Sequence, residues 1–107
     1  MSSDMTQRLE AMLAAGKETA LLRYTLGKGY LDAGQYGIAR EHLQRAVALD
    51  ANYSVAWKAL GKAALELGDS AAARAAWSSG LACAEARGDA QVVKELTVFL
   101  RRLDKSS

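Results

Sequence analysis

The chain has 107 residues, a length typical of one domain. It contains 22 alanines and 15 leucines but only 10 valines, isoleucines and threonines together and no proline, which nearly excludes sheet-based folds and indicates an all-α domain. Fourteen basic and 12 acidic residues leave a net charge of +2, too small for nucleic-acid binding driven by counterion release.

The first predicted element is a helix within residues 4–19. Met5, Leu9 and Met12 recur at helical spacing, and Gly16 is placed to end the helix. These apolar positions share the register of the second helix of the repeat that follows. The segment is therefore predicted to be an N-terminal half-repeat.

Residues 20–53 and 54–87 are two copies of one 34-residue unit. When the chain is shifted by 34 residues, eight positions of the two segments are identical. Each unit has apolar residues at helical spacing on both sides of a glycine, Gly34 in the first and Gly68 in the second. Each unit is therefore predicted to be two helices joined at a left-handed glycine, and Asp69 is placed to cap the helix that follows.

Residues 88–104 are predicted to form a closing helix. When the repeat is projected forwards with a two-residue insertion, Val93, Leu96 and Leu100 occupy the apolar positions of a first helix. Asp89 is placed to cap this helix at its start. Charged residues on the rest of the helix would give the end of the array the polar outer face that a terminal unit needs.

The two units resemble the tetratricopeptide repeat, a family with the 34-residue pattern W-x2-L-G-x2-Y, then A-x3-F, then P. Arg23 replaces the tryptophan in the first unit, Ala64 replaces the tyrosine in the second, and neither unit has the proline. The resemblance implies a right-handed α-solenoid of about six antiparallel helices that spans residues 1–107 as one domain. The matching residues are Leu26, Gly27, Tyr30, Ala39 and Leu43 in the first unit and Trp57, Leu60, Gly61, Ala73 and Trp77 in the second.

The resemblance also implies a function, because repeats of this family typically bind extended or helical peptides on their concave face. The positions that face this groove include five basic residues and no acidic one. We therefore expect a protein partner with an acidic segment whose apolar side chains pack between the lysines. The predicted groove residues are Tyr24, Lys28, Leu31, Val55, Lys58, Lys62, Leu65, Lys94, Val98 and Arg101.

Two alternatives to peptide binding stay open. In the first, the array assembles with itself through its ends, or serves as a scaffold subunit of a complex, and the groove is incidental. In the second, the basic positions are an ordinary solvated face. Peptide binding by a stand-alone module predicts a monomer, whereas assembly predicts a defined oligomer.

The sequence does not predict an enzyme. His42 follows Glu41 on a helix, without a second metal ligand or a nucleophile placed to face it, so we expect an exposed histidine without a function. The run Gly27-Lys28-Gly29 lacks the preceding strand and the spacing of a phosphate-binding loop. Neither a cofactor nor a metal ion is expected.

Cysteine content and hydropathy indicate the compartment. A lone cysteine, Cys83, has no partner for a disulfide within the chain, which fits the reducing cytoplasm. The longest apolar run, residues 11–15, is far shorter than the roughly 20 residues of a membrane helix, and residues 1–4 lack the basic start of a signal peptide. We expect a cytoplasmic protein that binds no membrane, and the abundance of alanine and arginine suggests a bacterial source.

Overall fold

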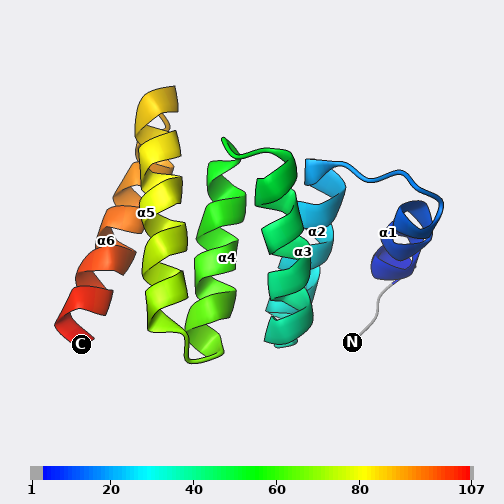
Figure 1. Cartoon of the computed structure of the whole chain (residues 1–107), viewed down its shortest axis with the longest axis horizontal. Coiled ribbons are helices and arrows are strands. Elements are labelled where there is room, and N and C mark those ends of the chain that lie inside the picture. Colours follow the sequence, from blue (N-terminus) through cyan, green and yellow to red (C-terminus); the bar gives the residue numbers. More distant parts are fainter. Residues whose placement is uncertain (1–3, 107) are drawn as a thin grey trace.

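A computed structural model describes residues 4–106, which form helices joined by short loops. Figure 1 shows α2 to α6 side by side and alternating in direction, with α1 set apart at the N-terminal end. The predicted all-α fold is confirmed, and the number of helices in the described residues is the six expected. The helices are α1 (Asp4–Ala14), α2 (Ala20–Asp32), α3 (Tyr36–Leu49), α4 (Ser54–Glu66), α5 (Ser70–Arg87) and α6 (Ala90–Ser106).

Two glycines make the turns inside the helix pairs. Gly34 lies between α2 and α3 with a φ of 79°, and Gly68 lies between α4 and α5 with a φ of 82°. Other residues rarely adopt this left-handed conformation because their Cβ approaches the following carbonyl oxygen. The predicted glycine turns are confirmed, and each reverses the chain so that the second helix runs back along the first.

Aspartates begin the last two helices. Oδ1 of Asp69 accepts a hydrogen bond from the backbone N–H of Ala72 at 3.0 Å, at the start of α5. Oδ1 of Asp89 accepts one from the backbone N–H of Val92 at 3.3 Å, at the start of α6. Each bond satisfies an N–H group that has no partner inside its helix. Both predicted caps are confirmed.

The hydrophobic core continues from one helix pair to the next. Leu43 belongs to a buried cluster from α3, α4 and α5, and Leu96 to a second cluster from α4, α5 and α6. Helices α4 and α5 therefore contribute to both clusters. This is the packing expected of a solenoid, in which each unit is buried by its neighbours rather than by itself.

The crossing of α4 and α5 is close because α4 has a glycine there. The indole of Trp77 in α5 occupies the space that a Cβ on Gly61 would need. The same indole donates a hydrogen bond from Nε1 to the carbonyl oxygen of Lys58, at 3.0 Å. Trp77 is thus held against the backbone of α4 by packing and by a hydrogen bond.

Helix α1 is attached less firmly than the others. None of its described residues is buried, and Met5 and Met12 are 64% and 43% exposed. Oε2 of Glu10 accepts a hydrogen bond from the hydroxyl group of Tyr30 at 2.6 Å and lies 3.9 Å from Nε2 of His42. No side chain of α1 belongs to either buried cluster, so polar contacts with Tyr30 and His42 are part of what joins this helix to α2 and α3.

Candidate functional site

A groove of about 680 Å³ crosses the first helix of each pair. Helices α2, α4 and α6 line it, together with Tyr36 at the start of α3 and Ser70 and Trp77 of α5. The volume lies within the range of roughly 300 to 1,000 Å³ that is typical of ligand-binding clefts. The groove is large enough to take several side chains of a peptide.

Seven of the ten predicted residues line this groove. All seven lie on α2 and α4, the helices that occupy equivalent positions in the two copies of the 34-residue unit. The structure therefore brings together the residues of both complete repeats. They are Tyr24, Lys28, Leu31, Val55, Lys58, Lys62 and Leu65.

The three residues predicted on α6 do not line the groove. Lys94 and Arg101 are exposed and Val98 is half-buried, and none of them belongs to the lining. Phe99 and Arg102 are found there instead, each one position further along the helix. A shift of one residue turns a helical position by about 100°, so the face of α6 that lines the groove lies about that angle from the predicted one.

An aromatic contact explains which face of α6 turns inward. The ring centroids of Phe99 and Trp77 are 5.2 Å apart and the ring planes are inclined by 48°, an arrangement that aromatic pairs favour. Val92, Leu96 and Leu103 are buried on the same side. Together with Phe99 they form an apolar stripe with spacings of 4, 3 and 4 residues, which is the sequence signal for this face.

Two of the groove lysines are paired with carboxylates. Nζ of Lys28 donates to both oxygens of Asp32, at 2.8 and 3.1 Å. Nζ of Lys58 donates to Oε1 of Glu95 at 2.9 Å, and this bond holds the pKa of the Glu95 carboxyl group below its usual range. The lining itself contains four basic and two acidic residues, so the groove is less basic than the sequence predicted.

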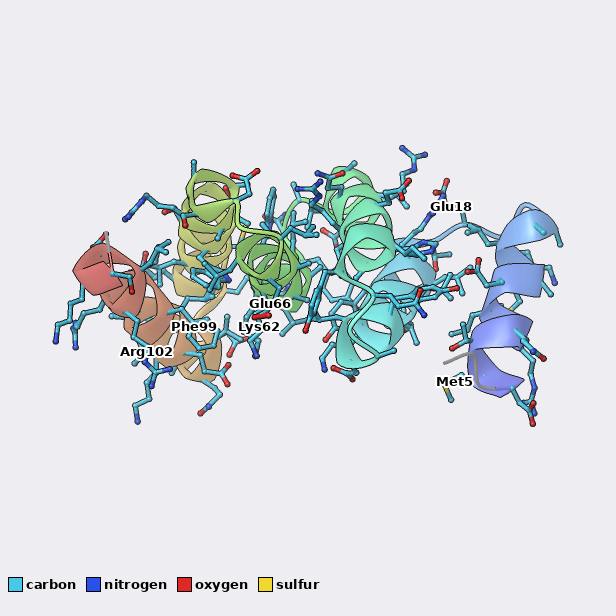
Figure 2. All side chains as sticks on the ribbon, turned by 90° about the horizontal axis from the view of Figure 1, so that it is seen from below. Met5, Glu18, Lys62, Glu66, Phe99 and Arg102 are labelled. Carbon is cyan, nitrogen blue, oxygen red and sulfur yellow. The ribbon has the colours of Figure 1, made fainter. Side chains whose placement is uncertain are left out.

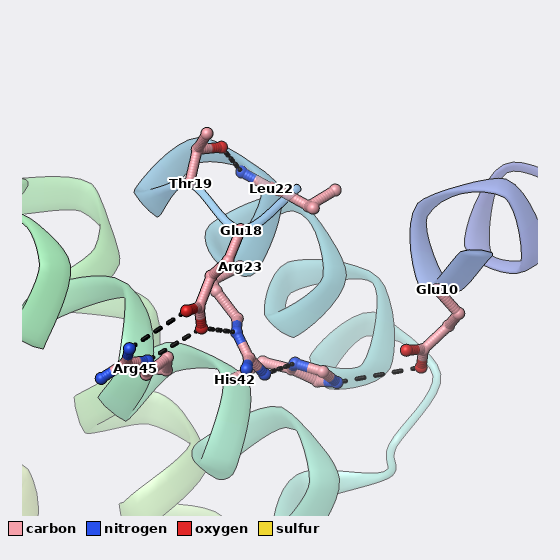
Figure 3. A network of polar contacts seen from close by, with 7 residues as sticks. All are labelled: Glu10, Glu18, Thr19, Leu22, Arg23, His42 and Arg45. Carbon is pink, nitrogen blue, oxygen red and sulfur yellow. Dashed lines mark hydrogen bonds and ion pairs between the residues drawn. The ribbon is translucent and has the colours of Figure 1, made fainter. Parts of the chain in front are cut away.

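His42 was expected to be exposed, but it is only 7% exposed and lies in a polar network between α1, α2 and α3, shown in Figure 3. Nδ1 of His42 lies 3.0 Å from Nη1 of Arg23, and because arginine only donates, Nδ1 is the acceptor and Nε2 carries the proton. The ring stacks on Tyr30 with a centroid distance of 5.5 Å. Burial holds the pKa of His42 below its usual range.

Glu18 extends this network toward the end of α3. Oε2 of Glu18 accepts hydrogen bonds from Nε of Arg45 and Nε of Arg23, both at 2.8 Å, and Oε1 accepts from Nη2 of Arg45 at 3.0 Å. These bonds, the one with Arg45 first, lower the pKa of Glu18 to about 2. None of these residues lines the groove, so the network joins helices rather than forming part of that site.

The described residues contain neither a metal-binding cluster nor a helix that could span a membrane. Within residues 4–106, no group of three or more histidine, cysteine, aspartate or glutamate side chains is placed to hold a metal ion. None of the described helices combines the length and the hydropathy that crossing a bilayer requires.

The chain is similar to known bacterial proteins along almost its whole length. A TPR repeat-containing protein of Pseudomonas aeruginosa is 58% identical over 102 residues, which cover 95% of this chain and 97% of that protein. The solution structure of a protein from Bordetella parapertussis matches with a TM-score of 0.83 and 57% identity, over 99% of this chain and 91% of the other. These similarities confirm the resemblance in both sequence and fold.

The family model of the tetratricopeptide repeat matches residues 20–63, which hold α2, α3 and most of α4. Proteins built from this repeat are in general protein–protein interaction modules and typically are not enzymes. With a relative of this identity and coverage, the chain belongs to the tetratricopeptide-repeat family.

Proposed function

We propose that this chain binds a peptide segment of a partner protein, with acidic and apolar side chains, in the groove between α2, α4 and α6. The observation that carries the proposal is the mixed character of the lining. Apolar side chains such as Leu31, Val55 and Leu65 line the groove together with basic ones. A peptide in the groove would bury the apolar groups while its carboxylates meet the cations.

The charge of the groove favours an acidic partner over a basic one. The four basic lining residues exceed the acidic ones, Asp32 and Glu66, by two charges. An excess of this size steers association and selects the sign of the partner more than it adds affinity. Binding is therefore expected to be modest and to weaken as the salt concentration rises.

The composition of the chain supports a proposal for its oligomeric state, its compartment and the class of its partner. We infer a monomer in the bacterial cytoplasm, where the lone thiol of Cys83 stays reduced. Neither nucleic acid nor a membrane surface is proposed as a partner, because a net charge of +2 is too small to hold either one by electrostatics. No cofactor or catalytic step is part of the proposal.

Site-specific photocrosslinking tests the groove. Benzoylphenylalanine replaces Tyr24, which lines the groove, or Gln44, which is exposed on α3 outside it. We expect a partner protein to be crosslinked in bacterial cells from the first position and not from the second. A synthetic peptide of the crosslinked segment should then shift amide resonances of α2, α4 and α6. Equal crosslinking from both positions, or shifts confined to α3 and α5, would contradict peptide binding in the groove.

Exposed apolar side chains at the N-terminal end favour a second candidate, self-assembly or a scaffold role. Met5 and Met12 of α1 and Leu21 at the start of α2 are largely exposed, Leu21 by 64%. A second copy of the chain, or another subunit of a complex, would bury them if it covered this end. Light scattering separates the candidates, because a monomer at high micromolar concentration supports peptide binding and a defined oligomer supports self-assembly.

A further inference from the structure

The four cations that line the groove differ in whether they already have a partner. Lys28 and Lys58 each donate to a carboxylate, as described above. Within residues 4–106, no ion pair joins Lys62 or the guanidinium group of Arg102 to a carboxylate. Two of the four cations thus already have a carboxylate partner in the protein, and the other two have none among the described residues.

Lys62 interacts with an aromatic ring instead. Its Nζ lies 5.4 Å from the ring centroid of Phe99. Such a contact positions the ammonium group but leaves its charge and its N–H donors free, because the ring supplies no hydrogen-bond acceptor of comparable strength. Lys62 also attracts the nearby carboxylate of Glu95, which is already bonded to Lys58. The ring therefore positions the amine of Lys62 while its N–H groups stay free to donate hydrogen bonds to a ligand.

Arg102 shares a face of α6 with Phe99. It follows Phe99 by three residues on α6, and side chains three positions apart share one face of a helix. Figure 2 shows Lys62 of α4 and Phe99 and Arg102 of α6 along the same side of the molecule. All three line the groove. The groove thus holds an aromatic ring and two cations that come from different helices and have no carboxylate partner among the described residues.

We infer that Lys62 and Arg102 are the specificity-determining residues of the groove and together hold one carboxylate side chain of the partner segment, with an apolar neighbour packed on Phe99. The inference rests on the proposed peptide binding and assigns its anion subsite. Two cations that approach from different helices can bind a carboxylate with both of its oxygens. Lys28 and Lys58, in contrast, stabilise the groove through Asp32 and Glu95.

Glu66 limits this subsite to a short acidic stretch. It lines the groove one helical turn beyond Lys62 on α4, and its carboxylate has no partner among the described residues. A second acidic side chain placed beside it would be repelled. The partner segment is therefore expected to carry a neutral or basic residue at that point, and Glu66→Gln should strengthen the binding of peptides that are acidic there.

Two adjacent arginines provide a matched test. Arg101 and Arg102 are both exposed, but only Arg102 lines the groove. Arg102→Glu and Arg101→Glu change the net charge equally. The probes are peptides selected against the wild-type chain from a phage library of random 12-residue sequences, with affinities measured by fluorescence anisotropy. We expect acidic peptides, a loss of at least about tenfold with Arg102→Glu, and a change below about twofold with Arg101→Glu. Arg102→Gln and Lys62→Gln should weaken binding more than Lys28→Gln.

Resonance mapping of the selected peptides separates failure of the inference from failure of the function. If the peptides shift groove resonances but contain no acidic residue, or bind equally well to both arginine variants, the inference is overturned while groove binding stands. If the peptides shift only resonances outside the groove, both are overturned. Circular dichroism checks that each variant remains folded, and Arg102→Gln replaces Arg102→Glu if the charge reversal unfolds the chain.

Discussion

Lys58 of α4 and Glu95 of α6 form an ion pair of 2.9 Å across one side of the groove. Both helices contact α5 far more than each other, so this pair is a direct link between two first helices of neighbouring units. Both side chains are mostly covered, at 23% and 33% exposure, which limits screening of the pair by solvent. The pair therefore joins α4 to α6 and lowers the positive charge that Lys58 brings to the groove.

Reversing both charges of this pair should restore part of the stability that is lost when only one charge is reversed. Lys58→Glu and Glu95→Lys should each lower the free energy of unfolding because each places like charges together. The double variant should recover part of the loss, with a coupling energy of about 0.5 to 1 kcal/mol. Urea melts of the wild type, the two single variants and the double variant measure this coupling. Strictly additive losses would show that the pair does not stabilise the fold.

The close crossing at Gly61 predicts opposite effects for two glycine substitutions. Gly61→Ala should cost about 1 to 3 kcal/mol, because its Cβ would overlap the indole of Trp77. Gly29→Ala, in the interior of α2 where the nearest atom is 4.0 Å away, should stabilise the protein by about 0.5 to 1 kcal/mol. Denaturant melts of both variants are compared with the wild type. Two changes of the same sign would mean that Gly61 is not packed as described.

Removal of the C-terminal helix α6 should destabilise the protein far more than removal of the N-terminal helix α1. Deleting residues 90–107 removes Val92, Leu96, Phe99 and Leu103, and uncovers Trp77, so the remainder should aggregate or melt at a much lower temperature. Deleting residues 1–16 removes no buried residue of α1 and should cost far less. Thermal melts followed by circular dichroism, together with light scattering, test both deletions. Similar behaviour of the two truncated chains would contradict the capping role of α6.

Burial of His42 predicts a loss of stability in mild acid. Its pKa is lowered from 6.5 in the folded state, so below pH 6.5 the unfolded chain binds the proton more readily and stability falls until the folded-state pKa is passed. His42 is the one histidine of the chain, so NMR titration reads its pKa without overlap. His42→Gln should remove this dependence from urea melts above and below pH 6.5. A titration midpoint at or above 6.5 would contradict the burial.

The helix pairs, and the faces of α2 and α4 that line the groove, could be predicted from the sequence. Helix ends are local features, because a glycine such as Gly34 or Gly68 and a capping residue such as Asp69 act on the backbone within a few residues. The 34-residue period then relates one unit to the next without any knowledge of their packing. Seven groove residues on α2 and α4 could be identified for this reason.

The face of α6 in the groove, the ion pair of Lys58 and the exposure of α1 depend on contacts between helices that are distant in the sequence. The closing helix has no second copy in the chain to fix its register, and the packing of Phe99 on Trp77 sets its rotation. Glu95 meets Lys58 across 37 residues only in that rotation. Such contacts depend on how one helix is turned toward another, and a repeat period describes each helix without specifying that angle.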